Sequence, residues 1–177
     1  MRNPVLHQFS AGATPGDAIT DHAILLRKWI REAGLRSEIF AESIHPSLAD
    51  DVHSYFSYRP RMKDEIVIYH HSIGSDVADY LLSLDVQVIL IYHNVTPPEF
   101  VRDVNPALAR QLEKGQDQLV DLQSATLLGL GVSAYDEQDL KRVGYDETGV
   151  LPIVLDESRY DLSPNQGLLG QYRDGSL

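Results

Sequence analysis

The chain has 177 residues, a formal net charge of −11, 43% hydrophobic residues and no cysteine. Its length suits a single domain, and its hydrophobic content can furnish a core, which excludes a disordered chain. The absence of cysteine excludes disulfides and thiol catalysis, and the acidic balance argues against broad nucleic-acid contact, which needs clustered lysine and arginine. No apolar run is long enough to span a membrane and no secretory leader is recognisable, so we expect a cytoplasmic protein.

Predicted strands and helices alternate along the chain. The expected strands are residues 5–9, 37–41, 65–69, 86–92, 127–132 and 148–154. Four helices are expected: one after Asp17, one from Asp76, one from Pro106 and one after Ser133. Each begins at a polar residue or a proline, which are common residues at helix N-termini. In the first helix one set of residues recurs at helical spacing and predicts the buried face: Ile19, Ala23, Leu26, Ile30 and Ala33.

This alternation predicts one α/β domain. Strands that alternate with helices form a mainly parallel sheet with helices on both faces, here of about six strands. We therefore expect a single Rossmann-like three-layer αβα domain over residues 1–156, with 42–63 as a long connection. After Asp156 the periodicity fades, and residues 157–177 are expected to form a linker.

Two buried strands end on histidine, where ligands bind in open α/β sheets. His70 and His71 are adjacent, so they point to opposite sides of an extended backbone. We expect His71, followed by Ser72, to face a ligand, and His70 to be packed or solvated.

The second of these strands runs into His93, followed by Asn94, Thr96 and two prolines that stiffen the loop. His93 can donate or accept a proton near neutral pH, which suits the orientation of a substrate hydroxyl. A structural capping role is an equal alternative from the residues alone. His70, His71 and His93 lack metal-ligand spacing, so no metal is expected.

The loop after the first strand carries Gly12 and Gly16 before the helix capped by Asp17. Glycine permits a tight turn, and a helix N-terminus favours anions. The Gly-x-Gly-x-x-Gly pattern of dinucleotide-binding proteins is missing, which disfavours a bound NAD-type cofactor, and a turn without a ligand stays open. Nucleophile-elbow and P-loop patterns are also missing.

Five stretches carry a family resemblance: residues 7–9 with 16–19, 68–75, 91–99, 132–133 and 151–156. The most specific is IYHNVTPPE at 91–99. In this order and spacing they resemble the N-terminal half of a GT-B retaining glycosyltransferase of the GT4 (group 1) type.

The resemblance implies a Rossmann-like domain that mainly holds the acceptor and closes on a C-terminal, donor-binding domain of the same parent chain. It implies that His93 lies near the transferred sugar and that the loop from Gly12 to Ile19 lies beside the donor phosphates, although the family's commoner Gly-Gly pair is not present. The expected substrate-binding residues are Gly12, Gly16, Asp17, Ala18, Ile19, His71, Ser72, Asn94, Thr96 and Ser133.

The favoured function is sugar transfer, with retention, from a nucleotide sugar to a glycan, lipid or other cell-envelope acceptor. The expected partners are the nucleotide sugar, a sugar or lipid acceptor and the second domain, with peripheral contact at the inner face of a membrane, no nucleic acid and no metal cofactor. The alternative is a non-enzymatic α/β module that binds a small ligand or docks a partner.

Overall fold

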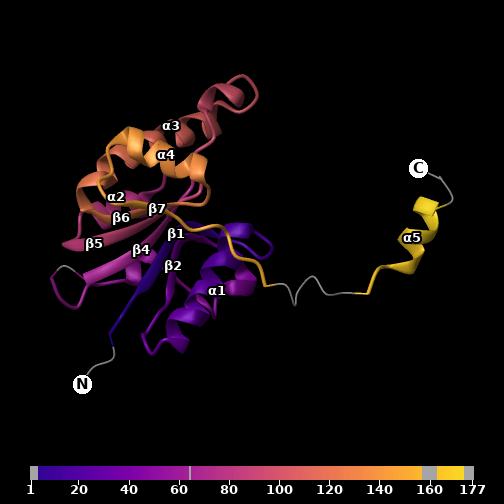
Figure 1. Ribbon diagram of the computed structural model, residues 1–177, viewed down its shortest axis with the longest axis horizontal. Coiled ribbons are helices and arrows are strands. Elements are labelled where there is room, and N and C mark those ends of the chain that lie inside the picture. Colours follow the sequence, from indigo (N-terminus) through magenta and orange to yellow (C-terminus); the bar gives the residue numbers. More distant parts are fainter. Residues whose placement is uncertain (1–3, 64, 157–162, 174–177) are drawn as a thin grey trace.

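The computed structural model describes residues 4–63, 65–156 and 163–173. Seven strands form one sheet in the order β3-β2-β1-β4-β5-β6-β7, and every neighbouring pair is parallel (Figure 1). The strands are β1 (His7–Ala13), β2 (Ile39–Ile44), β3 (Val52–Ser54), β4 (Glu65–His71), β5 (Val86–Tyr92), β6 (Thr126–Gly131) and β7 (Thr148–Val150). The predicted α/β class and parallel sheet are confirmed.

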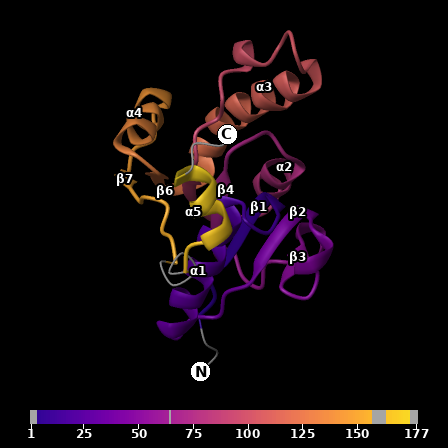
Figure 2. The same cartoon turned by 90° about the vertical axis from the view of Figure 1, so that its right-hand side faces the viewer.

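Helices cover both faces of the sheet. α1 (Ala18–Glu32) lies on one face, and α2 (Asp76–Leu82), α3 (Pro106–Asp121) and α4 (Ala134–Val143) lie on the other (Figures 1 and 2). Large aromatic and aliphatic side chains such as Tyr69 and Leu90 fill the core under α2–α4. A smaller core, with Ala23 and Ile39 among its members, lies under α1. The molecule therefore has three layers with unequal cores.

Several strand boundaries differ from those expected. β1 runs on to Ala13 because its second half pairs with β2, so Gly12 lies in a strand and not in a loop. The expected connection over 42–63 contains β3, which pairs with β2 and brings the sheet to seven strands. β7 ends at Val150, before Pro152, whose ring nitrogen has no hydrogen to donate to a neighbouring strand.

The buried face of α1 is more polar than expected. Ala23 is buried as predicted, but Ile19, Leu26 and Ile30 are only partly buried and Ala33 is exposed. The other buried residues of this helix are Thr20, His22 and Arg27. Arg27 donates to the backbone oxygen and the carboxylate of Asp51, at 2.7 and 3.2 Å. Polar partners on the α1 side thus replace the apolar stripe that the spacing predicts.

Part of the expected linker is helical. α5 (Gln166–Arg173) lies within it, whereas 157–162 and 174–177 fall outside the described residues. In the part of the chain that the structure describes, no helix is both long and apolar enough to cross a membrane.

Candidate functional site

A diagonal row of polar side chains crosses three strands on the α1 face of the sheet. Gln8 lies on β1, His70 near the end of β4, and His93 just after β5. His70 is in register with Ser10 and Ile91, so Gln8 and His93 are its diagonal neighbours. The Nε2 of His70 lies 3.0 Å from Oε1 of Gln8, and its Nδ1 lies 3.1 Å from Nε2 of His93. The row is thus one hydrogen-bonded chain.

The direction of these hydrogen bonds follows from Gln8. Its Nε2 donates to the carbonyl oxygen of Ala23 at 2.9 Å, which leaves its Oε1 to accept from His70. His70 therefore carries its proton on Nε2 and accepts at Nδ1 from the Nε2–H of His93. In this arrangement the Nδ1 of His93 holds a lone pair. It is buried, and no described group bonds to it.

His22 of α1 packs edge-on against this row. Its ring centroid lies 5.7 Å from that of His70 and 5.9 Å from that of His93, with interplanar angles of 76° in both cases. The residue is fully buried, and neither ring nitrogen bonds to any group in the described part of the chain. The sequence interpretation missed His22. It lies three residues after Ile19, on the face where burial was expected, and a polar residue at that spacing is the signal that could have found it.

Burial keeps these imidazoles neutral. Desolvation lowers the pKa of His93 to about 3 and the pKa of His70 well below its ordinary value, with nearby histidines as a further cause. Burial also lowers the pKa of His22. At neutral pH the group therefore offers lone pairs and N–H donors without a positive charge.

His71 points the other way, as adjacent residues on a strand must. It is fully buried on the α3 side, and its Nε2 donates to the backbone oxygen of Gly115 at 2.8 Å. The two histidines do face opposite sides, but the assignment is the reverse of the one expected. His70 faces His93, whereas His71 holds β4 against α3.

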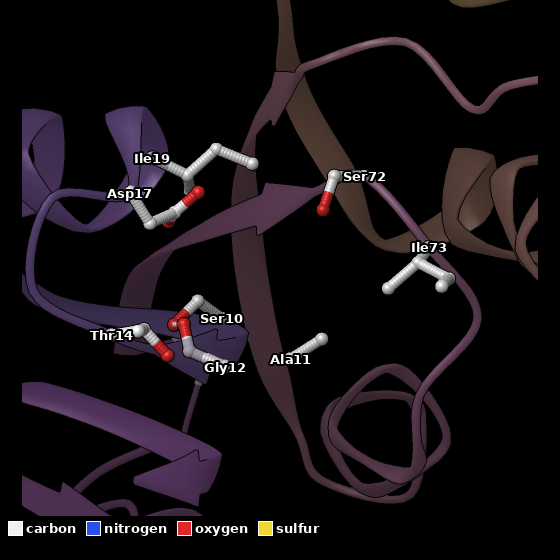
Figure 3. Close-up of a pocket in the computed structure, with 8 residues that line it drawn as sticks. All are labelled: Ser10, Ala11, Gly12, Thr14, Asp17, Ile19, Ser72 and Ile73. Carbon is white, nitrogen blue, oxygen red and sulfur yellow. Dashed lines mark hydrogen bonds between the residues drawn. The ribbon is translucent and has the colours of Figure 1, made fainter. Parts of the chain in front are cut away.

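A pocket of about 320 Å³ lies at the carboxyl ends of β1 and β4 (Figure 3). It is lined by Ser10, Ala11, Gly12, Thr14, Asp17, Ile19, Ser72 and Ile73. Figure 3 shows Asp17 and Ile19 on one side and Ser72 and Ile73 on the other. The structure thus brings together Gly12, Asp17, Ile19 and Ser72 of the expected site.

The turn before α1 is fixed by a network around Asp17. Its Oδ2 accepts from the backbone N–H and the hydroxyl of Thr20, both at 2.9 Å. Gly16 adopts a φ of +78°, which glycine accommodates readily. Gly16 in this turn and Ala18 at the start of α1 are exposed, but they do not line the pocket.

The remaining expected residues lie elsewhere, so the expected single crevice is divided. Asn94, with a φ of +64°, lines a second pocket of about 280 Å³ between the loop after β5, α3 and α4. Thr96 is exposed outside the lining of either pocket. Ser133 caps α4, where its Oγ accepts from the backbone N–H of Asp136 at 3.2 Å.

Comparison with known proteins shows the fold. No family model and no curated protein matches the sequence. An α-glucosyltransferase in complex with UDP and a 13-mer DNA containing an HMU base matches with a TM-score of 0.59 at 12% identity, over 94% of this chain and 47% of that one. An α-glucosyltransferase in complex with UDP-glucose and DNA containing an abasic site matches with a TM-score of 0.52 at 11% identity, over 88% and 44%. The chain therefore shares the Rossmann-like fold of these structures and spans about half of their length.

These structures also correct the expectation of no nucleic-acid partner. The two glucosyltransferases named above are in complex with DNA. The exclusion rested on the net charge of −11, but net charge describes the whole surface, whereas nucleic acid is held by a local one. The acidic composition therefore does not exclude nucleic acid.

Proposed function

We propose that this chain provides one Rossmann-like domain of a nucleotide-sugar-dependent glycosyltransferase. The observation that carries the proposal is the pocket at the carboxyl ends of β1 and β4, in a fold shared with glucosyltransferases in complex with UDP or UDP-glucose. Ligands of open α/β sheets bind at such strand ends. The finer proposal is a hexosyltransferase of the GT4 type that transfers with retention.

The start of α1, Ser72 and His93 have separate roles in the proposed function. The end of β1 from Gly12, the turn that follows it and the start of α1 to Ile19 offer backbone N–H groups and the positive end of a helix dipole to an anionic or hydroxyl-rich ligand. Ser72 supplies a hydroxyl from the opposite wall. His93 does not line this pocket, and its ring bonds to His70. Its backbone N–H donates to the oxygen of His71 at 2.9 Å, and we propose that it orients the sugar from this fixed position.

The donor is a substrate, and no metal ion is assigned to its phosphates. The pocket lining offers a single carboxylate, Asp17, which caps α1. Mg²⁺ at phosphates is held by one or two carboxylates, and the Oδ2 of Asp17 already accepts two hydrogen bonds from Thr20, so we propose no metal ion there.

The acceptor has two candidate classes. The sequence resemblance favours a glycan, lipid or other cell-envelope acceptor, with the protein in the cytoplasm at the inner face of the membrane. DNA is the second candidate, because the matching glucosyltransferases are in complex with it.

The test is a transfer assay with the protein encoded by the complete reading frame. Radiolabelled UDP- and GDP-sugars are offered with glycan, lipid and duplex-DNA acceptors, and the labelled product is counted. We expect transfer to one acceptor class, lost in His93→Ala and retained in His45→Ala, an exposed histidine outside the site. A protein that binds a small ligand but transfers no sugar to any acceptor would instead be the binding module.

A further inference from the structure

Three histidines from three elements converge under α1. His22 comes from α1, His70 from β4, and His93 from the loop after β5. Each offers one ring nitrogen such that the three nitrogens lie within 4.8 Å of one another. His22 and His70 are at most 1% exposed. No spacing in the sequence indicates this set, because its members lie 48 and 23 residues apart.

The cluster has polar atoms that the protein leaves unbonded. Both nitrogens of His22 and the Nδ1 of His93 are buried, with no hydrogen-bond partner among the described residues. A buried donor or acceptor without a partner is destabilising, and native structures rarely keep one without a ligand, an ion or an ordered water beside it. One nitrogen from each ring lies within 4.8 Å of the others, and the unbonded nitrogens of the fully buried His22 indicate an occupant there.

The chemistry of the cluster favours a metal ion over an organic ligand. The group consists entirely of imidazoles, which suit zinc, copper and nickel, whereas magnesium and calcium prefer oxygen. Three histidines with an open fourth position are a known zinc arrangement.

The hydrogen bonds around His70 are those expected of a metal-binding histidine. A ligating histidine almost always donates its other N–H to a fixed acceptor. Here the Nε2–H of His70 donates to Gln8, itself held by Ala23, so the lone pair of Nδ1 is aimed at the cluster.

We propose that His22, His70 and His93 form a binding site for one divalent transition-metal ion, with Zn²⁺ as the best fit. Tetrahedral zinc with N–Zn bonds of about 2.0–2.1 Å places neighbouring nitrogens about 3.4 Å apart. The 3.1 Å between His70 Nδ1 and His93 Nε2 is close to that value. When the ion binds, it replaces the proton between these two nitrogens, and His93 then carries its proton on Nδ1. His22, which no described hydrogen bond restrains, closes the set by rotating its ring.

The ion would tie α1 to the ends of β4 and β5. His93 is partly exposed and provides the route by which an ion reaches the cluster. The site shares His93 with the proposed sugar transfer, but metal binding is measured without any donor or acceptor, so either proposal can fail without the other.

The experiment uses the complete 177-residue chain, freed of any affinity tag and stripped with a chelator. Zn²⁺ is titrated by calorimetry, metal content is measured after dialysis, and Co²⁺ is used as a spectroscopic probe of the ligands. We expect one ion per chain, a higher melting temperature with zinc, and the visible absorption bands of tetrahedral Co²⁺.

Matched variants make the result specific. His22→Phe keeps a buried ring while leaving the bond between His70 and His93 in place, and His93→Ala removes a second ligand. Both should lose the stoichiometric ion and the Co²⁺ bands, whereas His45→Ala and His53→Ala, at exposed positions, should keep them. Retention of the ion by His22→Phe would overturn the proposal. So would a zinc-soaked crystal with an ordered water, and no anomalous zinc signal, between the three rings.

Discussion

The Nε2 of His71 lies 2.8 Å from the backbone oxygen of Gly115, and this contact fixes α3 against the end of β4. Beside it, the backbone N–H of Gly74 donates to the oxygen of Gln111 at 3.0 Å. The segment that carries Ser72 and Ile73 into the pocket is therefore positioned by α3, although neither residue belongs to that helix.

The close approach at this point predicts that Gly115→Ala destabilises the fold. A Cβ on Gly115 would lie 2.7 Å from the backbone nitrogen of Gly74, so α3 and the loop must separate. We expect a loss of about 1–3 kcal/mol in the free energy of unfolding, measured by urea denaturation. Gly170→Ala is the control, because a Cβ there meets nothing within 4 Å. An unchanged urea midpoint for Gly115→Ala would show that the two segments part without cost.

Acid should destabilise the metal-free chain. Burial lowers the pKa of His71 to about 4, whereas in the unfolded chain it is about 6.5. Between these values the unfolded state binds the proton and the folded state does not, so stability is present above pH 6.5 and falls as the pH drops towards 4. The slope is at most about 1.4 kcal/mol per pH unit for one histidine.

The measurement is urea unfolding in EDTA at several pH values between 7.5 and 4.5. His71→Gln retains a donor for Gly115 but cannot titrate, and its stability should depend less steeply on pH than that of the wild type. Identical pH profiles for the two proteins would contradict the assignment to His71.

His93→Ala, made in the protein encoded by the complete reading frame, should affect turnover more than folding. We expect turnover to fall by about a hundredfold or more, as for a positioned acid–base or orienting group. In EDTA, the melting temperature should move by only a few degrees, because one hydrogen bond to His70 is lost. Turnover and melting are measured on the same preparation. A large loss of stability with intact turnover per folded molecule would give His93 a structural role.

The 177-residue chain by itself should transfer no sugar and bind nucleotide sugars weakly. Its pocket of about 320 Å³ is open at the strand ends, and the matching structures are about twice its length. Calorimetric titration with UDP- and GDP-sugars should yield little heat at micromolar concentrations, with the complete reading-frame product as the comparison. Tight binding to this chain would place the donor site within these residues.

The sheet and its helices could be predicted because they depend on local patterns. The run 86–92 matches β5, and Asn105 caps α3 as its sequence indicates, accepting from the backbone N–H of Leu108 at 3.1 Å. β3 could not be found in this way, because its three residues become a strand only through pairing with β2. Pairing with β2 likewise extends β1 past the point where its own pattern fades.

The site was harder to predict, because it depends on which helix covers which face. Alternation along a strand shows that His70 and His71 diverge, but not which of them faces α1. That choice follows from the placement of α1, whose Ala23 accepts from Gln8, and of α3, whose Gly115 accepts from His71. The role of His22 also needs the fold, because its partners lie on strands far along the chain.

The order of the strands places the two shortest ones, β3 and β7, at the two edges of the sheet, each with three residues. An edge strand displays unpaired backbone groups that can recruit a strand from another molecule, and a short edge displays few of them. The long apolar strands β4 and β5 are paired on both sides. The segments most able to seed aggregation are therefore shielded by the sheet itself for as long as it stays folded.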